Sequence, residues 1–457
     1  MVIRSSNVHG ETLDVTDYGE RKDWISNLPE EILCHILSFM PTKNAIQTGI
    51  LSTRWKSLWT SVPIIHLDDW WHRCGFPDFV DRVLLLHNSP NLYKFLLRCT
   101  DSYLLSSWIS TAIEHHVQEL DLDVKSGSIT ELPRHLFTSI DLVVLKFGRF
   151  HFDWSSLTVT LPRLKVLHLC SLTFLDESMF NKFLSGCPAL EELEIDSLPR
   201  IKALRICSSS LKKLIVYNRG RPVEHKLVIK APSLETLELD DESSIVYEVD
   251  ELPTLVKAIF HVGRVDYECS DDYCNAVVQM LAKASNVQHL RIDDPTLKVV
   301  VHASAYNQLL FCSLTHLDIG IHDIPLSGVT DLLGRIPGVR VLVLTKTCSS
   351  RKILGKARKA RKCSSVCLWG GAPENVPTCL SLSLEKIEFH GLSWCQHELK
   401  LERYLLENAM VLKKLTLHSW SRNRKIKTEL QRYYNKRGSS TCQIEFHHKL
   451  SSVKWLF

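Results

Sequence analysis

A six-residue hydrophobic pattern recurs along most of the chain. It places an aliphatic residue, two other residues, an aliphatic, one other residue and a final aliphatic, as in LPRLKVLHL around Leu164. Most successive starts are 21 to 28 residues apart. Clear copies start at Leu164, Leu190, Leu234, Leu314 and Leu412, and weaker copies start at Leu92, Val117, Leu142, Leu211, Leu255, Val287, Val339 and Leu384.

This spacing predicts a solenoid of stacked strands. The last two aliphatics of each copy are two residues apart, so they lie on one side of an extended strand. One such strand cannot bury that side alone, whereas stacked copies form a parallel sheet with a shared core. The period fits leucine-rich repeats of about 20–29 residues. We expect helices or irregular turns in the returning segments. A doubly wound α/β sheet also alternates strand and helix, but it would not repeat one signature thirteen times.

Residues 23–60 depart from the repeat and predict three short helices. Pro29, Glu30 and Glu31 suit a first helical turn, and Met40-Pro41 ends that helix. The further stretches run from about Thr42 to Gly49 and from Ser52 to Trp59. So small a unit carries more apolar surface than it can bury internally. Two explanations remain open at this point: the surplus surface packs on the first repeat, or it binds another protein.

The motifs of this segment resemble the plant-type F-box. Leu28-Pro29, Ile32-Leu33, Ile36-Leu37, Pro41-Thr42-Lys43 and Leu51 to Trp59 (LSTRWKSLW) fall at the spacing of that family. The resemblance implies binding to a Skp-type adaptor and, through it, to cullin. The adaptor contacts that it implies are Leu28, Pro29, Ile32, Leu33, Ile36, Leu37, Leu51 and Trp55, with Leu51 and Trp55 shared between core and interface.

The resemblance extends beyond this module. The segment from Leu161 to Leu193 resembles the signature repeat of plant F-box leucine-rich proteins, and the segment from Val376 to Leu417 resembles the FBD domain. The expected fold class is α/β, with a three-helix F-box followed by a curved leucine-rich repeat solenoid with a parallel sheet. The expected domains are a flexible tail (1–22), the F-box (23–62), leucine-rich repeats (63–370), and an FBD domain that continues the solenoid and carries a basic C-terminal segment (371–457).

Composition and charge exclude several classes of protein. The formal charge of +4 over 457 residues gives no reason to expect a nucleic-acid or membrane partner. Several of the 15 cysteines lie in apolar, strand-like runs, which indicates free thiols and a nuclear or cytoplasmic location. Basic runs at 351–362 and 421–437 suit a nuclear import signal or a nucleic-acid contact, but solvated inserts explain them more simply.

No catalytic or cofactor motif is found in the sequence. It lacks the glycine-rich phosphate loop and the Gly-x-Ser-x-Gly elbow. The pairs Cys363/Cys367, Cys269/Cys274, His115/His116 and His447/His448 do not form matched zinc ligand pairs. We therefore expect a non-enzyme without a metal or cofactor. An enzyme built on a solenoid frame is the rival hypothesis.

The strand pattern also predicts which side chains face the inner surface of the solenoid. These are the residue between the last two aliphatics of each copy and the residue just after them. Nine acids stand there against three Arg or Lys, which predicts a mildly acidic face for a basic or neutral protein segment. The alternative is that the acids only keep the sheet soluble. The client-binding candidates are Glu194, Glu238, Asp240, Arg291, Asp293 and Asp318.

Together these features predict the substrate-recognition subunit of a Skp–cullin–F-box ubiquitin ligase, which holds an unidentified client protein and performs no bond chemistry. The alternative is an F-box scaffold that binds partners without client ubiquitination.

Overall fold

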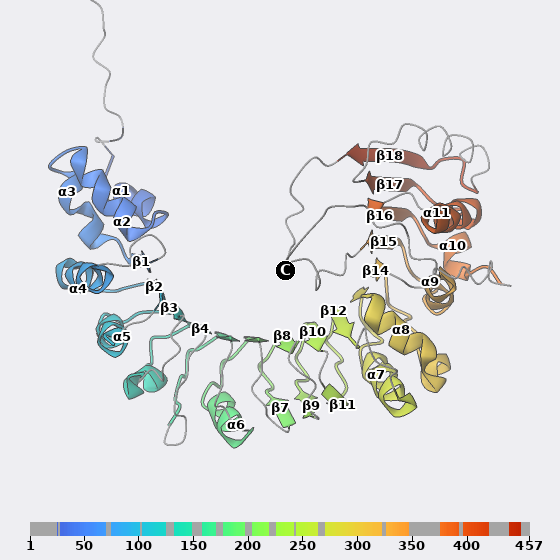
Figure 1. Ribbon diagram of the computed structural model, residues 1–457, viewed down its shortest axis with the longest axis horizontal. Coiled ribbons are helices and arrows are strands. Elements are labelled where there is room, and N and C mark those ends of the chain that lie inside the picture. Colours follow the sequence, from blue (N-terminus) through green and yellow to red (C-terminus); the bar gives the residue numbers. More distant parts are fainter. Residues whose placement is uncertain are drawn as a thin grey trace, which may run out of the picture.

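The computed structural model is an arch whose inner side is lined by strands and whose outer side carries most of the helices (Figure 1). It describes residues 25, 28–69, 75–100, 103–124, 132–148, 158–170, 177–196, 203–218, 225–241, 244–263, 270–321, 326–346, 375–392, 396–419 and 438–448. The predicted N-terminal tail and both basic runs lie outside these residues.

A single parallel sheet runs the length of the arch. Within the described residues it has 15 strands, and each pairs with its neighbour in register. The strands, in spatial order, are β1 (Ile64–Asp68), β2 (Lys94–Cys99), β3 (Glu119–Val124), β4 (Val144–Gly148), β5 (Val166–Cys170), β6 (Glu192–Asp196), β8 (Lys213–Asn218), β10 (Thr236–Asp241), β12 (Lys257–Val262), β13 (His289–Ile292), β14 (His316–Ile321), β15 (Val341–Lys346), β16 (Lys386–Leu392), β17 (Lys414–Ser419) and β18 (Gln443–His448).

Each of the thirteen predicted copies forms one strand of this sheet, so the solenoid prediction is confirmed. Two strands were not predicted, β1 and β18, and they are the first and last of the sheet. A terminal repeat contacts one neighbour only, and its sequence is therefore less constrained. Ile444 and Phe446 of β18 are only partly buried, unlike the equivalent residues of β17.

The returning segments differ from the prediction in the middle of the arch. There β7 (Ala203–Cys207), β9 (His225–Lys230) and β11 (Ser244–Val249) form a second parallel sheet in the order β11-β9-β7. The copies starting at Leu190, Leu211, Leu234 and Leu255 are only 21 to 23 residues apart. So short a repeat leaves room for a strand, which rises about 3.3 Å per residue, but not for a helix of several turns.

Longer repeats return through helices. These are α4 (Phe76–Leu86), α5 (Leu105–Glu114), η4 (Arg134–Thr138), α6 (Glu177–Ser185), α7 (Asp271–Lys283), α8 (Asp294–His302), η5 (Ser304–Gln308), α9 (Leu326–Leu333), α10 (Thr378–Leu382) and α11 (Gln396–Asn408). Helices α6 and α7 pack against β7 and β11, the two edge strands of the second sheet. The edges are therefore covered, which protects them from pairing with another chain. No helix in the described part of the chain has the length and apolar composition needed to cross a membrane.

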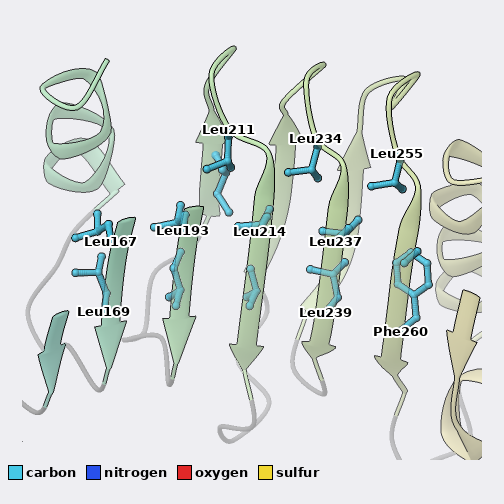
Figure 2. Packing of buried hydrophobic residues seen from close by; sticks show 14 of the residues in the cluster. Leu167, Leu169, Leu193, Leu211, Leu214, Leu234, Leu237, Leu239, Leu255 and Phe260 are labelled. Atoms are coloured by element: carbon cyan, nitrogen blue, oxygen red, sulfur yellow. The ribbon is translucent and has the colours of Figure 1, made fainter. Parts of the chain in front are cut away.

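A continuous hydrophobic core fills the space between the main sheet and the outer layer. Most main-sheet strands alternate partly exposed and buried residues, as expected for a sheet with one solvated face. Leu193, Leu214 and Leu237 occupy equivalent buried positions on three neighbouring strands (Figure 2). Every repeat therefore supports the next one.

This arrangement predicts the cost of removing one core side chain. Leu237→Ala should lower the free energy of unfolding by about 2–5 kcal/mol, because it removes buried methyl groups and leaves a cavity between repeats. Thr236→Ala, on the partly exposed face of the same strand, is the control. It should change the free energy of unfolding by at most about 0.5 kcal/mol. Urea unfolding followed by circular dichroism measures both; equal values would contradict this packing.

The N-terminal helical module is joined directly to the sheet. It consists of α1 (Glu30–Ser38), α2 (Thr42–Gln47), η1 (Thr48–Ile50), α3 (Trp55–Leu58) and η2 (Trp59–Ser61). The Thr42 hydroxyl accepts a 2.8 Å hydrogen bond from the backbone N–H of His66 in β1. The buried residues of the module belong to the same hydrophobic cluster as the repeats. The module therefore covers the first edge of the sheet.

Candidate partner-binding surfaces

Helix α1 carries two apolar stripes. Leu33 and Leu37, four residues apart, are completely buried in the core. Ile32, Ile36 and Phe39 have the spacing of a second stripe. Ile32 is 46% exposed and Phe39 is 77% exposed, and Ile36 is half-buried. The helix thus packs on the chain through one stripe and presents the other to solvent.

The predicted adaptor contacts divide between these environments. Pro29, Ile32 and Leu51 are exposed, and Leu28 and Ile36 are half-buried. Leu33 and Leu37 lie in the core, which corrects the expectation that they belong to an exposed edge, and Trp55, which was expected to be shared between core and interface, is buried as well. Their burial follows from the contacts of α1 with α3 and η2, which close the centre of the module. These three side chains are therefore held inside the module.

Two strongly exposed residues were not among the predicted contacts. Phe39 closes the outer stripe of α1, and Ile50, in η1, is 90% exposed. The periodicity of α1 was a usable signal for Phe39, because it lies seven residues after Ile32. We define the helical edge as Leu28, Pro29, Ile32, Ile36, Phe39, Ile50 and Leu51. Exposed apolar surfaces of this kind are characteristic of interaction sites.

The helical edge is held in shape by contacts between its elements. Arg54 donates a 2.7 Å hydrogen bond to the backbone carbonyl of Leu28, which ties the start of α1 to the third helical segment. A Cβ added at Gly49 would lie 3.3 Å from the Cα of Lys56. Glycine therefore permits the close approach of η1 and α3, which explains a residue that is otherwise unfavourable near a helix end.

The second candidate surface is the concave face of the main sheet. Its partly exposed positions carry many carboxylates, as predicted, but most of these carboxylates have a basic partner nearby. Lys94 pairs with Glu119 at 3.1 Å, and Lys213 pairs with Glu192 at 2.9 Å. Both acids are the first residues of their strands, β3 and β6, so each of these pairs joins the first positions of two neighbouring strands.

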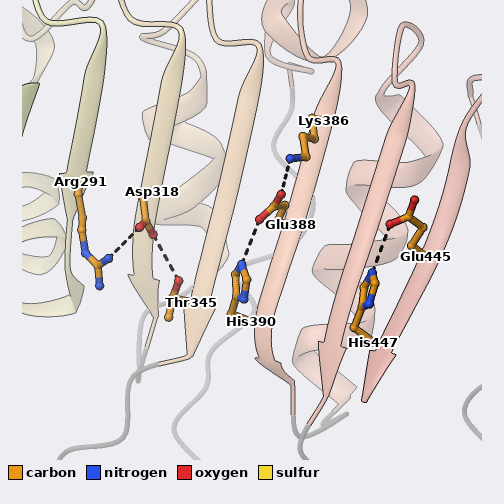
Figure 3. Close-up of polar contacts among 8 residues, drawn as sticks. All are labelled: Arg291, Asp318, Thr345, Lys386, Glu388, His390, Glu445 and His447. Atoms are coloured by element: carbon orange, nitrogen blue, oxygen red, sulfur yellow. Dashed lines mark hydrogen bonds and ion pairs between the residues drawn. The ribbon is translucent and has the colours of Figure 1, made fainter. Parts of the chain in front are cut away.

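Polar pairs continue through the C-terminal strands (Figure 3). Asp318 accepts from Arg291 at 3.0 Å and from Thr345 at 3.4 Å. Burial raises the pKa of Asp318, and Arg291 and Thr345 offset part of that rise. Glu388 pairs with Lys386 at 2.5 Å and with His390 at 3.1 Å. Partial burial alone would raise the pKa of Glu388, but these two partners outweigh it and lower the pKa.

The client-binding candidates have unequal access to solvent. Glu194 and Glu238 are half-buried on the concave face, and Glu238 accepts a 3.0 Å hydrogen bond from Tyr217. Asp240 is buried, which corrects the expectation that it faces a partner. Asp293 lies beyond the end of β13, where it caps α8 through the backbone N–H of Thr296.

Asp293 also pairs with His261 at 2.8 Å. Burial alone would lower the pKa of His261, but the hydrogen bond and the charge of Asp293 raise it. Asp293 therefore has a structural task, which leaves Glu194, Glu238, Arg291 and Asp318 as accessible candidates. Arg291 and Asp318 are already paired with each other.

Histidines line the far end of the concave face. The ring of His418 in β17 stacks on His390 of β16 at 4.4 Å and on His447 of β18 at 4.9 Å. His447 contacts Glu445 at 3.2 Å. The paired strands hold these rings in one row, since His390, His418 and His447 are register partners.

Three models of known protein families match this chain. The model of the F-box domain matches residues 25–67, which include the helical edge. The model of the leucine-rich repeats of the FBD-associated F-box protein At5g56370 matches residues 105–258. The FBD model matches residues 372–417, from before α10 into β17, so this region continues the main sheet. The exact domain boundaries, at residues 62/63 and 370/371, remain predictions.

Three curated relatives come from Arabidopsis thaliana. The F-box/FBD/LRR-repeat protein At5g22660 is 32% identical over 93% of this chain and 96% of its own length. The F-box/LRR-repeat protein 13 is 32% identical over 86% of this chain and 89% of its own length. The FBD-associated F-box protein At1g66310 is 31% identical over 92% of this chain and 95% of its own length. The molecule is thus an F-box protein with a leucine-rich repeat solenoid. The chain belongs to the plant family of F-box/FBD/LRR-repeat proteins.

Proposed function

We propose that this chain is the substrate-recognition subunit of a Skp–cullin–F-box ubiquitin ligase. The helical edge binds the Skp-type adaptor, and the concave face binds a client protein. The observation that supports the proposal best is the exposure of Ile32, Phe39 and Leu51 on a module whose other side is packed against β1. The repeats, as far as the structure describes them, leave this surface open, so a partner is the simplest reason for keeping it apolar.

The proposed contribution of the chain to ubiquitin transfer is proximity. A client held on the concave face is brought near a ubiquitin-loaded enzyme that the adaptor and cullin recruit, which raises the effective concentration of its lysines. F-box proteins with leucine-rich repeats are typically non-catalytic adaptors, and the proposal assigns no bond chemistry to this chain.

The rival function is that of an F-box scaffold that binds partners without client ubiquitination. Clients are identified as proteins whose half-life lengthens when the chain is removed and when the proteasome is inhibited. The proposal expects their ubiquitination in a reconstituted ligase to require the chain. A bound protein that is neither ubiquitinated nor stabilised would favour the scaffold.

The contribution of the concave face can be tested on a client identified in this way. Glu194→Ala together with Glu238→Ala should weaken its capture about 5–30-fold, since each truncated interface charge costs about 0.5–1 kcal/mol. Glu407→Ala, outside the main sheet, is the control. Unchanged capture by the double variant, measured by surface plasmon resonance, would remove these carboxylates from the binding surface.

A further inference from the structure

Three side chains with metal-ligand chemistry converge on the concave face between β5 and β6. His168 of β5 is the register partner of Glu194 in β6, and Glu192 lies two residues earlier on β6. The Nε2 atom of His168 is 3.2 Å from Glu192 Oε1, and its Nδ1 atom is 3.4 Å from Glu194 Oε2. One ligand atom from each residue can be chosen so that all three lie within 4.8 Å of one another.

The donor set suits a divalent transition metal. Imidazole nitrogen and carboxylate oxygen bind Zn²⁺ at about 2.0–2.2 Å, so two ligands of a tetrahedral ion lie roughly 3.4 Å apart. The separations between His168 and the two carboxylates are already close to that value. A single imidazole nitrogen must serve the ion, so one glutamate has to rotate about its side-chain bonds. All three side chains are partly exposed, which leaves room for that rotation.

The regular backbone of the two strands favours such a site. Regular pairing of β5 and β6 fixes the three Cα positions, so the ligands are placed before an ion arrives. Lys213 holds Glu192 through Oε1 at 2.9 Å, and Oε2 can turn toward an ion.

We propose that His168, Glu192 and Glu194 bind one divalent transition-metal ion, Zn²⁺ foremost, on the concave face of the solenoid. The ion keeps coordination positions open toward solvent, because the strands supply ligands from one side only. On the same face, the next register pair toward the carboxyl ends of these strands is Cys170 and Asp196. The site is independent of the helical edge, so its failure would leave the proposed function untouched.

Titration of the purified full-length chain with Zn²⁺ tests the proposal, after removal of any polyhistidine tag. The wild type should retain one equivalent more than the His168→Asn variant and than the Glu194→Gln variant, as measured by mass spectrometry of bound metal after desalting. Cysteines and other histidines can bind zinc weakly, so the difference between proteins is the readout. Co²⁺ should give a visible absorption band in the wild type that both variants lack.

Two control variants match the test residues in their setting. Glu238→Gln changes another half-buried carboxylate of the concave face, and His289→Asn changes another histidine of that face. Both should keep the wild-type metal content. Circular dichroism establishes whether each variant is folded. If His168→Asn is unfolded, the comparison of the wild type with Glu194→Gln tests the proposal. Equal zinc in wild type and Glu194→Gln, or none in wild type, would overturn the proposal.

Discussion

The double variant Ile32→Lys, Leu51→Lys should lose its adaptor while staying folded. Ile32 is 46% exposed and Leu51 is 65% exposed, and neither lies in the hydrophobic core, so the variant should remain folded. The exposed parts of these two side chains add up to about one whole side chain, whose burial in a complex is worth about 1.5–3 kcal/mol, so its loss weakens binding roughly 10- to 100-fold. Co-purification of a Skp-type adaptor with the chain measures the effect.

A matched control is available outside the F-box. Leu85 of α4 is 83% exposed, so Leu85→Lys introduces the same charge on an equally accessible leucine. This variant should recover as much adaptor as the wild type. Equal recovery by the double variant and by Leu85→Lys would contradict the assignment of the helical edge as the interface.

The second large effect concerns a buried acid in the FBD region. Glu402 of α11 is only 1% exposed, and its Oε1 has no hydrogen-bond partner in the described part of the chain. Burial, aided by the nearby charge of Glu398, raises the pKa of Glu402 from 4.5 to about 8. The folded protein therefore binds a proton that the unfolded chain releases between these two pH values, and stability falls as pH rises from 4.5 to about 8.

Replacing Glu402 by glutamine should remove this dependence. The variant keeps the shape of the neutral acid, and at about pH 8 it should be more stable than the wild type by on the order of 3 to 5 kcal/mol. Near pH 5 the two should differ little. Urea unfolding across this range measures the change. Glu407→Gln is the control on the same helix, where a partly exposed glutamate pairs with Arg403. A gain that does not depend on pH would contradict the account.

The main sheet could be predicted from the sequence because its signal is local and repeated. Each copy places two aliphatics on one side of a strand, and thirteen such strands follow. The second sheet could not be predicted in the same way. Whether a returning segment such as 225–230 forms a strand depends on its neighbours at 203–207 and 244–249, which supply its hydrogen bonds.

The helical edge shows a different limit of sequence reasoning. The apolar pattern of α1 covers Ile32, Leu33, Ile36 and Leu37 together, and it does not say which stripe meets the rest of the chain. Packing of α1 against α3 and η2 decides this, and it buries Leu33 and Leu37. The proposed metal ligands could not be recognised from the sequence for a related reason. His168 and Glu194 are far apart along the chain and become neighbours only when β5 pairs with β6.

The most direct test of the central claim is side-chain footprinting of the chain alone and with a Skp-type adaptor. Carbene labelling followed by mass spectrometry reports the solvent access of Ile32, Phe39 and Leu51. We predict that all three are labelled in the free chain and protected in the complex, while Leu85 is labelled in both. An adaptor that binds and leaves the labelling of these three residues unchanged would contradict the claim that the exposed stripe of α1 and its neighbours recruit the ligase.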